Sequence, residues 1–383
     1  PSRTSPSSAT LGVGSHSVTA TYTGDTYFTG STAPTFDQVV GQVTPTIGVT
    51  STVNPSVFGQ PVGFTATLSG IDGTPTGQVQ FGIDGNNFGT PVTLAGGMAA
   101  SSPTSALTVG SHNVTATYLG STIYKPASAS LNQIVNKANS ATTIGSSPNP
   151  SVTSSPVNFT ATVTAVAPGA GTPSGQVQFY SAGSPLGSPA GLNGGGVATL
   201  TGVTSLPVGN DSVTATYLGD GNFNPSTSAS LTQQVNGFAT TTTVGSSANP
   251  SVFGQPVVFS ATVSAGAGNP TPTGQVQFGI DGANVGGATA LSSGSASLPP
   301  IATLAVGTHV VTATYLGAVN FVGSAGTLAG GQTVNQASTT TTVGSSANPS
   351  VFGQPVNFTA TVTAVAPGAG TPTGVVHFFV DGV

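Results

Sequence analysis

The sequence contains no cysteine, no tryptophan and no glutamate, and its only basic side chains are Arg3, Lys125 and Lys137. Without cysteine neither a disulfide framework nor a thiolate metal site can form, so packing alone must hold the fold. Three basic residues in a chain of 383 cannot build a positive groove, which excludes nucleic acid as a partner. No run of about 18 apolar residues occurs, so we expect no membrane insertion in this segment.

Glycine and proline, in contrast, are abundant, with 55 and 29 residues. They indicate dense turns, and the apolar residues between them fall in short alternating runs that can form small cores. Charged residues make up only 3% of the chain, so hydroxyls, amides and attached glycans would have to keep the surface soluble. The sequence begins at Pro1 without a charged and apolar leader, as expected of a processed or excerpted piece. This composition favours an extended extracellular polymer.

A repeat of about 98 residues organises the chain. The segment Thr-Ala-Thr-Tyr ends at Tyr22, Tyr118, Tyr217 and Tyr315, at spacings of 96, 99 and 98 residues. This period is the size of one small β-sandwich domain, so each repeat should fold on its own. We expect each of these four tyrosines to lie in the core of its own repeat. The expected units are a partial repeat at 1–43 (later strands only), complete repeats at 44–136, 137–236 and 237–336, and a partial repeat at 337–383 (earlier strands only).

Two further markers keep the same order and phase. Asn-Pro-Ser begins at four positions and Gly-Gln-Val-Gln-Phe at three. Near the end of the chain the related segment Gly-Val-Val-His-Phe takes the place of the second marker. Residues 158–173 are identical to residues 357–372, which indicates recent duplication of the unit. The markers start at Asn54, Asn149, Asn249 and Asn348, and at Gly77, Gly175, Gly274 and Gly374.

Within a repeat the apolar residues alternate with polar ones, as in half-buried strands. Phe64, Ala66 and Leu68 lie on one face of such a run, and Val114 and Tyr118 follow the same pattern later. Asp-Gly pairs at 84–85, 281–282 and 381–382 suit tight hairpins because both residues tolerate positive φ. Roughly seven strands per repeat and no helical periodicity predict an all-β fold of tandem immunoglobulin-like antiparallel sandwiches, arranged as an elongated rod or fibre.

These motifs resemble the bacterial immunoglobulin-like domain repeats of large surface-exposed proteins. The resemblance covers essentially the whole chain and rests on residues 54–62, 73–81 and 213–223. It implies a sandwich fold and a role in stalks, adhesins or appendages outside the cell, and it brings no catalytic residues. The Gly-Asp-x-x-Phe loop keeps its aspartate at Asp25 and Asp220 but has Ser121 and Ala318 elsewhere, so no uniform role for that aspartate follows.

Few residues are candidates for a chemical site. His16, His112 and His309 share one repeat position, and Asp211 replaces them in the remaining unit, 137–236. No partner recurs beside them, so we expect a structural turn role. Asp25 and Asp220 are weak Ca²⁺ candidates, with turn capping as the ordinary alternative. Acceptor triplets for N-linked sugar occur at Asn113, Asn158, Asn210 and Asn357.

The sequence therefore predicts a non-enzymatic extracellular stalk or fibre without cofactor. The alternative is an adhesin that binds carbohydrate or protein through its inter-strand loops, of which residues 183–196 and their equivalents vary between repeats. The partial repeats complement each other, so we expect self-association, in which Val362 and Phe378 face Val18, Ala20 and Tyr22 of another copy, or continuation in a longer array.

Overall fold

The computed structural model of the protein describes residues 2–7, 11–71 and 73–382. These residues form strands, turns and loops and no helix, so none of them belongs to a helix that could span a membrane. By its internal contacts the chain divides into two units. Unit 1 comprises Pro1–Ser146, Asn158–Thr201 and Ser212–Thr232, and unit 2 comprises Ser147–Val157, Gly202–Asp211 and Gln233–Val383.

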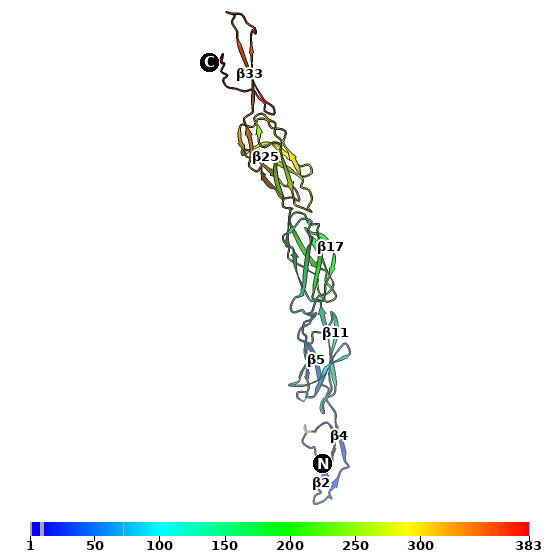
Figure 1. The fold of residues 1–383 in the computed structure, drawn as a ribbon. Helices are drawn as coiled ribbons and strands as arrows, with labels where there is room; N and C mark the ends of the chain where they lie inside the picture. The colour runs from blue at the N-terminus through cyan, green and yellow to red at the C-terminus, as the bar shows by residue number, and fades with distance from the viewer. Residues whose placement is uncertain (1, 8–10, 72, 383) are drawn as a thin grey trace. The chain divides into compact units, whose positions relative to one another are not determined.

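Repeat 1 (44–136) is a sandwich of a three-stranded and a five-stranded sheet, in the orders β10-β7-β5 and β6-β12-β11-β8-β9. Neighbouring strands are antiparallel, except that β6 runs parallel to β12. Figure 1 labels β5 and β11, one strand from each sheet. The bounds are β5 (Thr46–Ser51), β6 (Ser56–Val57), β7 (Phe64–Ser69), β8 (Gln78–Ile83), β9 (Asn86–Thr93), β10 (Met98–Ala100), β11 (Gly110–Tyr118) and β12 (Ala127–Asn136).

The core of repeat 1 follows the alternation of its sequence. Phe64 and Ala66 of β7 meet Phe81 of β8 and Tyr118 of β11, and all four side chains are at most 1% exposed. Each aromatic ring buried in this way contributes on the order of 2–3 kcal/mol of hydrophobic free energy. The intervening residues, such as Thr67, face outward and are exposed. The expected all-β sandwich is therefore confirmed, with an additional short strand, β6, that Pro55 separates from β5.

Repeat 2 (137–236) has the same two sheets, in the orders β13-β15-β18 and β14-β21-β19-β16-β17, with β20 pairing on β19. Val177, Phe179 and Tyr217 take the buried positions of Val79, Phe81 and Tyr118. Its strands are β13 (Ser140–Ser147), β14 (Ser151–Val152), β15 (Val157–Ala165), β16 (Gln176–Ser181), β17 (Ser184–Gly191), β18 (Val197–Val203), β19 (Gly209–Tyr217), β20 (Ser226–Thr227) and β21 (Leu231–Asn236).

Repeat 3 (237–336) differs in that one long strand is divided into β28 and β29 at Val310. Its sheets have the orders β22-β24-β27, β23-β31-β28 and β26-β25-β29-β30. The strands are β22 (Thr241–Ser246), β23 (Ser251–Val252), β24 (Phe259–Ser264), β25 (Gln275–Ile280), β26 (Ala283–Ala290), β27 (Ser295–Ser297), β28 (Gly307–His309), β29 (Val311–Tyr315), β30 (Ser324–Thr327) and β31 (Gln332–Asn335).

The strands described in the N-terminal segment (1–43) and the C-terminal segment (337–383) pair in two-stranded ladders. Tyr22 is 45% exposed and Phe378 is 50% exposed, whereas their counterparts Tyr118 and Phe81 are fully buried. The expectation that Tyr22 is a core residue is therefore wrong in this structure, because no second sheet covers its face. Residues 374–380 are not in a strand, since the strand that pairs with their counterparts is missing here. The strands are β1 (Gly14–Val18), β2 (Thr21–Tyr22), β3 (Ser31–Thr32), β4 (Phe36–Val40), β32 (Thr339–Ser345) and β33 (Phe358–Ala364).

Candidate functional site

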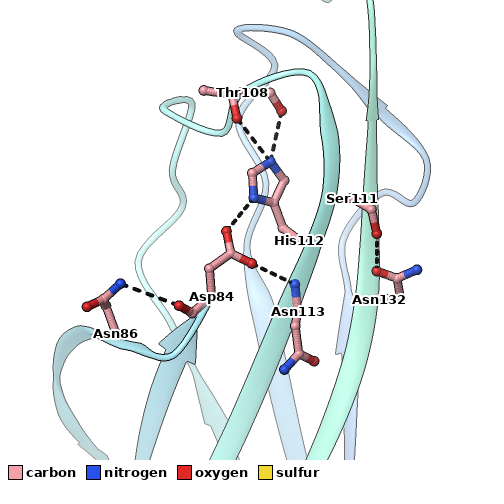
Figure 2. Close-up of polar contacts among 7 residues, drawn as sticks. All are labelled: Asp84, Asn86, Thr108, Ser111, His112, Asn113 and Asn132. Atoms are coloured by element: carbon pink, nitrogen blue, oxygen red, sulfur yellow. Dashed lines mark hydrogen bonds and ion pairs between the residues drawn. The ribbon is translucent and has the colours of Figure 1, made fainter.

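A histidine and an aspartate of repeat 1 lie against each other where β8 ends and β11 begins. Nδ1 of His112, on β11, is 2.7 Å from Oδ2 of Asp84, which begins the hairpin between β8 and β9 (Figure 2). The other carboxylate oxygen accepts a hydrogen bond of 2.9 Å from the backbone amide of Asn113. Asp84 has a φ of 50° and Gly85 a φ of 83°, as the sequence predicts for a tight Asp-Gly hairpin. This pair, which we call the Asp–His tie, fastens the hairpin to the long strand.

Each ring nitrogen of His112 has a hydrogen-bond acceptor as its nearest polar neighbour, and the Thr108 hydroxyl lies farther off, 3.5 Å from Nε2. Nε2 lies 2.9 Å from the carbonyl oxygen of Thr108, opposite the contact with Asp84. An imidazole can donate to both partners only when it carries two protons, so the geometry favours the imidazolium. The hydrogen bond that His112 donates to Asp84, with the one it donates to the Thr108 carbonyl, raises the pKa of His112, and the contact with His112 lowers the pKa of Asp84. The tie is therefore a charge-assisted hydrogen bond.

The tie recurs in repeat 3 and is absent from repeat 2. Nδ1 of His309 lies 2.7 Å from Oδ2 of Asp281, and Nε2 lies 2.9 Å from the carbonyl of Ala305. In repeat 2 the histidine position holds Asp211 and the hairpin begins with Ala182, so both partners change together. The expectation that no partner recurs beside the histidines is wrong. The partner of each histidine is the aspartate of the Asp-Gly pair 28 residues earlier. The sequence signal for this contact was that repeat 2 replaces both the histidine and the aspartate.

Asp211 has a different environment from the histidines it replaces. Its side chain is buried, and Oδ2 has no hydrogen-bond partner. Burial raises the pKa of this carboxyl, because the ionised form loses hydration without gaining a counter-charge. In the N-terminal segment, Nε2 of His16 lies 2.6 Å from the carbonyl of Gly12. No aspartate of that segment occupies the position of Asp84, which belongs to the missing early strands.

The Asp–His tie leaves little capacity for acid–base chemistry. Every nitrogen of His112 and both oxygens of Asp84 are engaged within the repeat. A general base needs a free nitrogen within hydrogen-bond reach of a substrate, and here a backbone carbonyl occupies it. The arrangement therefore holds two strands together. Among the described residues no group of three or more His, Asp, Glu or Cys side chains could hold a metal ion.

The Ca²⁺ candidates Asp25 and Asp220 both organise their own loops. Asp220 accepts hydrogen bonds from the amides of Asn222 and Phe223 and from the amide and hydroxyl of Ser174, at 2.7–2.8 Å. Burial opposes its ionisation, but these bonds prevail and lower the pKa of Asp220 to about 2. Asp25 likewise accepts bonds from the Tyr22 hydroxyl and from two backbone amides. The carboxylate oxygens thus already have donors of the kind that cap turns.

The recurring tyrosines connect the core to the loop that precedes β8 in repeat 1 and β25 in repeat 3. The hydroxyl of Tyr118 donates a 2.5 Å hydrogen bond to the carbonyl of Thr76, and Tyr315 donates to Thr273 in the same way. Tyr217 lies beside Asp220 instead, and burial with that carboxylate raises its pKa. The two hydrogen bonds give the rings of Tyr118 and Tyr315 a polar anchor, as large amphipathic aromatics require in a core, whereas the Tyr217 hydroxyl is buried without a hydrogen-bond partner.

A second recurring polar cluster was missed from the sequence. Gln133 is fully buried, and its amide donates to the carbonyls of Val53 and Ile134 and to the hydroxyl of Ser56. Asn54, the first residue of the Asn-Pro-Ser marker, accepts a bond from the amide of Ile134. Gln233 with Asn149 and Gln332 with Asn249 repeat this arrangement. The fixed position of the glutamine, two residues before the Val-Asn pair that ends each complete repeat, was the available signal.

The four asparagines that could accept N-linked sugar are all exposed. Asn113, Asn158 and Asn210 lie on strands β11, β15 and β19, and Asn357 immediately precedes β33. Their side chains are therefore on the surface, and glycosylation stays a prediction.

The fold defines a chain of immunoglobulin-like sandwiches, and comparison of sequences assigns the family. The profile of the bacterial Ig-like domain (group 3) matches residues 49–136, 143–236 and 242–343, so the chain belongs to this family. No curated protein sequence matches it significantly.

Several solved structures are similar to parts of the chain. A tetra-tandem repeat in the extending region of a large adhesion protein is 23% identical, with 83% of this chain and 81% of that chain covered and a TM-score of 0.42. A 1.5-MDa bacterial ice-binding adhesin is 17% identical (coverage 77% and 100%, TM-score 0.32). Domains A168–A170 of titin are 12% identical (coverage 74% and 97%, TM-score 0.32). These likenesses assign no function to the chain.

Proposed function

We propose that this chain is a structural spacer of an extracellular bacterial protein, a stalk whose repeats hold another part of the protein away from the cell surface. The observation that carries the proposal is that the polar side chains recurring from repeat to repeat are committed to the fold itself. The Asp–His tie, the tyrosine anchor and the buried glutamine all contact groups within their own repeat. The polar residues that recur between repeats of this chain thus serve to stabilise each repeat. Membership of the bacterial Ig-like domain family supports the extracellular location.

The neutral surface supports the same role. Threonine and serine occupy many outward positions of the strands, and only 3% of the residues carry charge. Such a surface offers no steering field for a charged ligand. It is compatible with a spacer that must avoid binding along its length.

Small-angle X-ray scattering of the whole chain tests this proposal. A stalk requires that successive repeats advance along one direction, by roughly 30–40 Å each for strands of about ten residues. The expected pair-distance distribution is long and skewed. A compact, symmetric distribution would contradict a spacer.

We further propose that the exposed apolar faces of the two incomplete segments are covered by strands of another repeat. Val18 and Tyr22 are 47% and 45% exposed and Phe358 is 51% exposed, while residues in the same positions of complete repeats are buried. The N-terminal segment carries the histidine of the tie and the C-terminal segment carries its Asp-Gly pair. These halves complement each other, as expected if Asp381 meets His16 in a composite sandwich.

Sedimentation velocity of the 383-residue chain tests this complementation. We expect association that rises with concentration, and its loss in the variant Tyr22→Asp, which places a charge on the apolar face. Tyr27→Asp is the matched control, because Tyr27 is 89% exposed and lies outside that face. A chain that stays monomeric at all concentrations would show that second copies do not supply the missing strands.

An adhesive role is the second candidate, and one loop favours it. The connection between β17 and β18 holds Leu192–Gly196, one residue longer than its counterparts at 94–97 and 291–294. The side chain of Asn193 shapes this loop by accepting bonds from the amides of Gly195 and Val197. A glycan array probed with the chain and with a variant carrying the shorter loop of repeat 3 distinguishes the roles. Binding that depends on the longer loop would support an adhesin over a spacer.

A further inference from the structure

A turn of repeat 1 contacts a loop of repeat 2 within unit 1. The ring of Phe58 meets the buried ring of Phe223 edge-on, with centroids 5.6 Å apart and an interplanar angle of 79°. The backbone amide of Ala170 donates a 3.3 Å hydrogen bond to the carbonyl of Phe58. An aromatic contact and a backbone hydrogen bond therefore join two domains that each have their own core.

Residues without bulky side chains allow this approach. Gly59 has a φ of +77°, and a Cβ atom there would overlap the backbone of Ala170. A Cβ atom on Gly169 would lie 2.5 Å from the Cβ atom of Ala138, which belongs to the linker between the repeats. Three parts are thus fitted to one another, namely the Phe58-Gly59 turn, the Ala138 linker and the loop 165–171, whose sequence is Ala-Val-Ala-Pro-Gly-Ala-Gly.

The same three parts meet again in unit 2, between repeat 3 and the C-terminal segment. Ala369 donates a 3.3 Å hydrogen bond to the carbonyl of Phe253, and Gly254 lies against Ala369 as Gly59 lies against Ala170. A Cβ atom on Gly368 would lie 2.6 Å from that of the linker residue Ala337. The loop 364–370 repeats the sequence of 165–171. The same interface, with a backbone hydrogen bond and two close glycine approaches, is therefore present at both junctions.

The sequence between these two junctions lacks all three parts. Repeat 2 has Thr153 and Ser154 in place of the Phe-Gly turn, and the linker to repeat 3 carries Phe238 in place of alanine. The loop of repeat 3 reads Ala-Gly-Ala-Gly-Asn-Pro at 265–270. Phe238 packs on Phe321 of its own repeat, with ring centroids 5.8 Å apart. Turn, linker and loop change together, as expected of parts that function only in combination.

We propose that the Phe-Gly turn is an interdomain docking site whose partner is an adjoining Ig-like repeat with an alanine linker and an Ala-Val-Ala-Pro-Gly-Ala-Gly loop. Docking fixes the two repeats against each other, so a pair of repeats is the rigid building block of the array. Adjoining domains move relative to each other by default unless an interface restrains them, and this one supplies an aromatic contact with close backbone packing. The inference does not depend on the extracellular role.

Distance measurements between spin labels in the whole chain test the proposal. The absence of cysteine allows labels at Asn87→Cys in repeat 1 and Ser188→Cys in repeat 2, both exposed positions. The expected distribution is narrow, and Phe58→Thr should broaden it. Threonine is the residue that repeat 2 itself carries at this position, so the turn can accept it. The matched control is Phe352→Thr, which removes the same ring from a turn where it is fully exposed, and should leave the distribution unchanged.

A variant on the other side of the interface, in repeat 2, distinguishes loss of docking from a local structural defect caused by Phe58→Thr in repeat 1. Gly169→Ala in repeat 2 adds one methyl group against Ala138 and should also broaden the distribution. Hydrogen exchange of the core strands β7 and β15 shows whether both sandwiches stay folded. Broadening in folded Phe58→Thr and Gly169→Ala proteins supports the docking site. An unchanged width in either folded variant, or a broad distribution in the parent chain, overturns it.

Discussion

Nδ1 of His112 and Oδ2 of Asp84 lie 2.7 Å apart although 28 residues separate them in the chain. The contact joins a hairpin turn to the strand that crosses the middle of its sheet. Because Nε2 also faces the carbonyl of Thr108, the geometry favours the doubly protonated ring. This charge state makes the stability of repeats 1 and 3 depend on pH.

We expect repeat 1 to lose stability as the pH rises above about 6.5, the ordinary pKa of histidine. The pKa of His112 is raised in the folded state, so its contribution is complete below the unfolded value and is lost as the pH passes through the folded value. The pKa of Asp84 is lowered, so its contribution disappears only in acid, below about 4. Hydrogen exchange resolved by repeat, measured from pH 4 to 8, should show this decline.

The variant His112→Ala should remove the decline in repeat 1 and leave that of repeat 3, where His309 and Asp281 form the same contact. Repeat 3 is therefore the internal control. A decline that persists unchanged in the variant would show that the tie does not set the pH dependence.

Repeat 2 should respond to pH for a different reason. The pKa of Asp211 is raised by burial, so ionisation destabilises the folded repeat as the pH rises above about 4. Asp211→Asn should stabilise repeat 2 at pH 7 by about 1 kcal/mol, because the variant avoids burying a charge without a partner. Asp37→Asn, at an exposed site of the N-terminal segment, is the control and should have no effect on repeat 2. Equal stability of parent and Asp211→Asn from pH 4 to 7 would contradict this account.

Asp220 should make repeat 2 lose stability in acid. Its pKa is lowered to about 2, so its contribution is present above the unfolded value near 4 and is lost as the pH falls toward 2. Asp220→Ser introduces the residue that repeat 1 carries in this loop, where the Ser121 hydroxyl accepts a hydrogen bond from the backbone amide of Tyr124. It should cost roughly 2 kcal/mol at pH 7 and almost nothing at pH 2. Chemical denaturation at the two pH values measures the difference, and an equal cost at both would refute the assignment.

Tyr118→Ala should unfold repeat 1 without unfolding repeat 3. Removing a fully buried aromatic ring costs about 3–5 kcal/mol, which is a large part of the stability of a small domain. Tyr22→Ala removes the same side chain from a half-exposed position and should cost far less in the isolated chain. Calorimetry should show one lost transition for Tyr118→Ala. A uniform shift of the whole melting profile would mean that the repeats do not fold separately.

The sequence by itself determined the sandwich and its repetition. Alternation in runs such as 64–68 specifies which face is buried, because side chains on a strand point to opposite sides. The Asp-Gly pair at 84–85 specifies its hairpin through local backbone preference, and the spacing of Tyr118 and Tyr217 specifies the length of one repeat. These features depend on residues close together in the chain, and their signals are visible without a structure.

Only the tertiary structure decided which distant polar groups meet. His112 and Asp84 come together because β8 and β11 are neighbours in one sheet, with Val114 opposite Ile83, and this register cannot be read from either strand alone. The contact of Phe58 with Phe223 depends on how two separately folded domains abut. The exposure of Tyr22 depends on the missing second sheet, since the same side chain is buried in every complete repeat. Long-range pairing, domain contact and burial are properties of the assembled chain, which is why local patterns do not determine them.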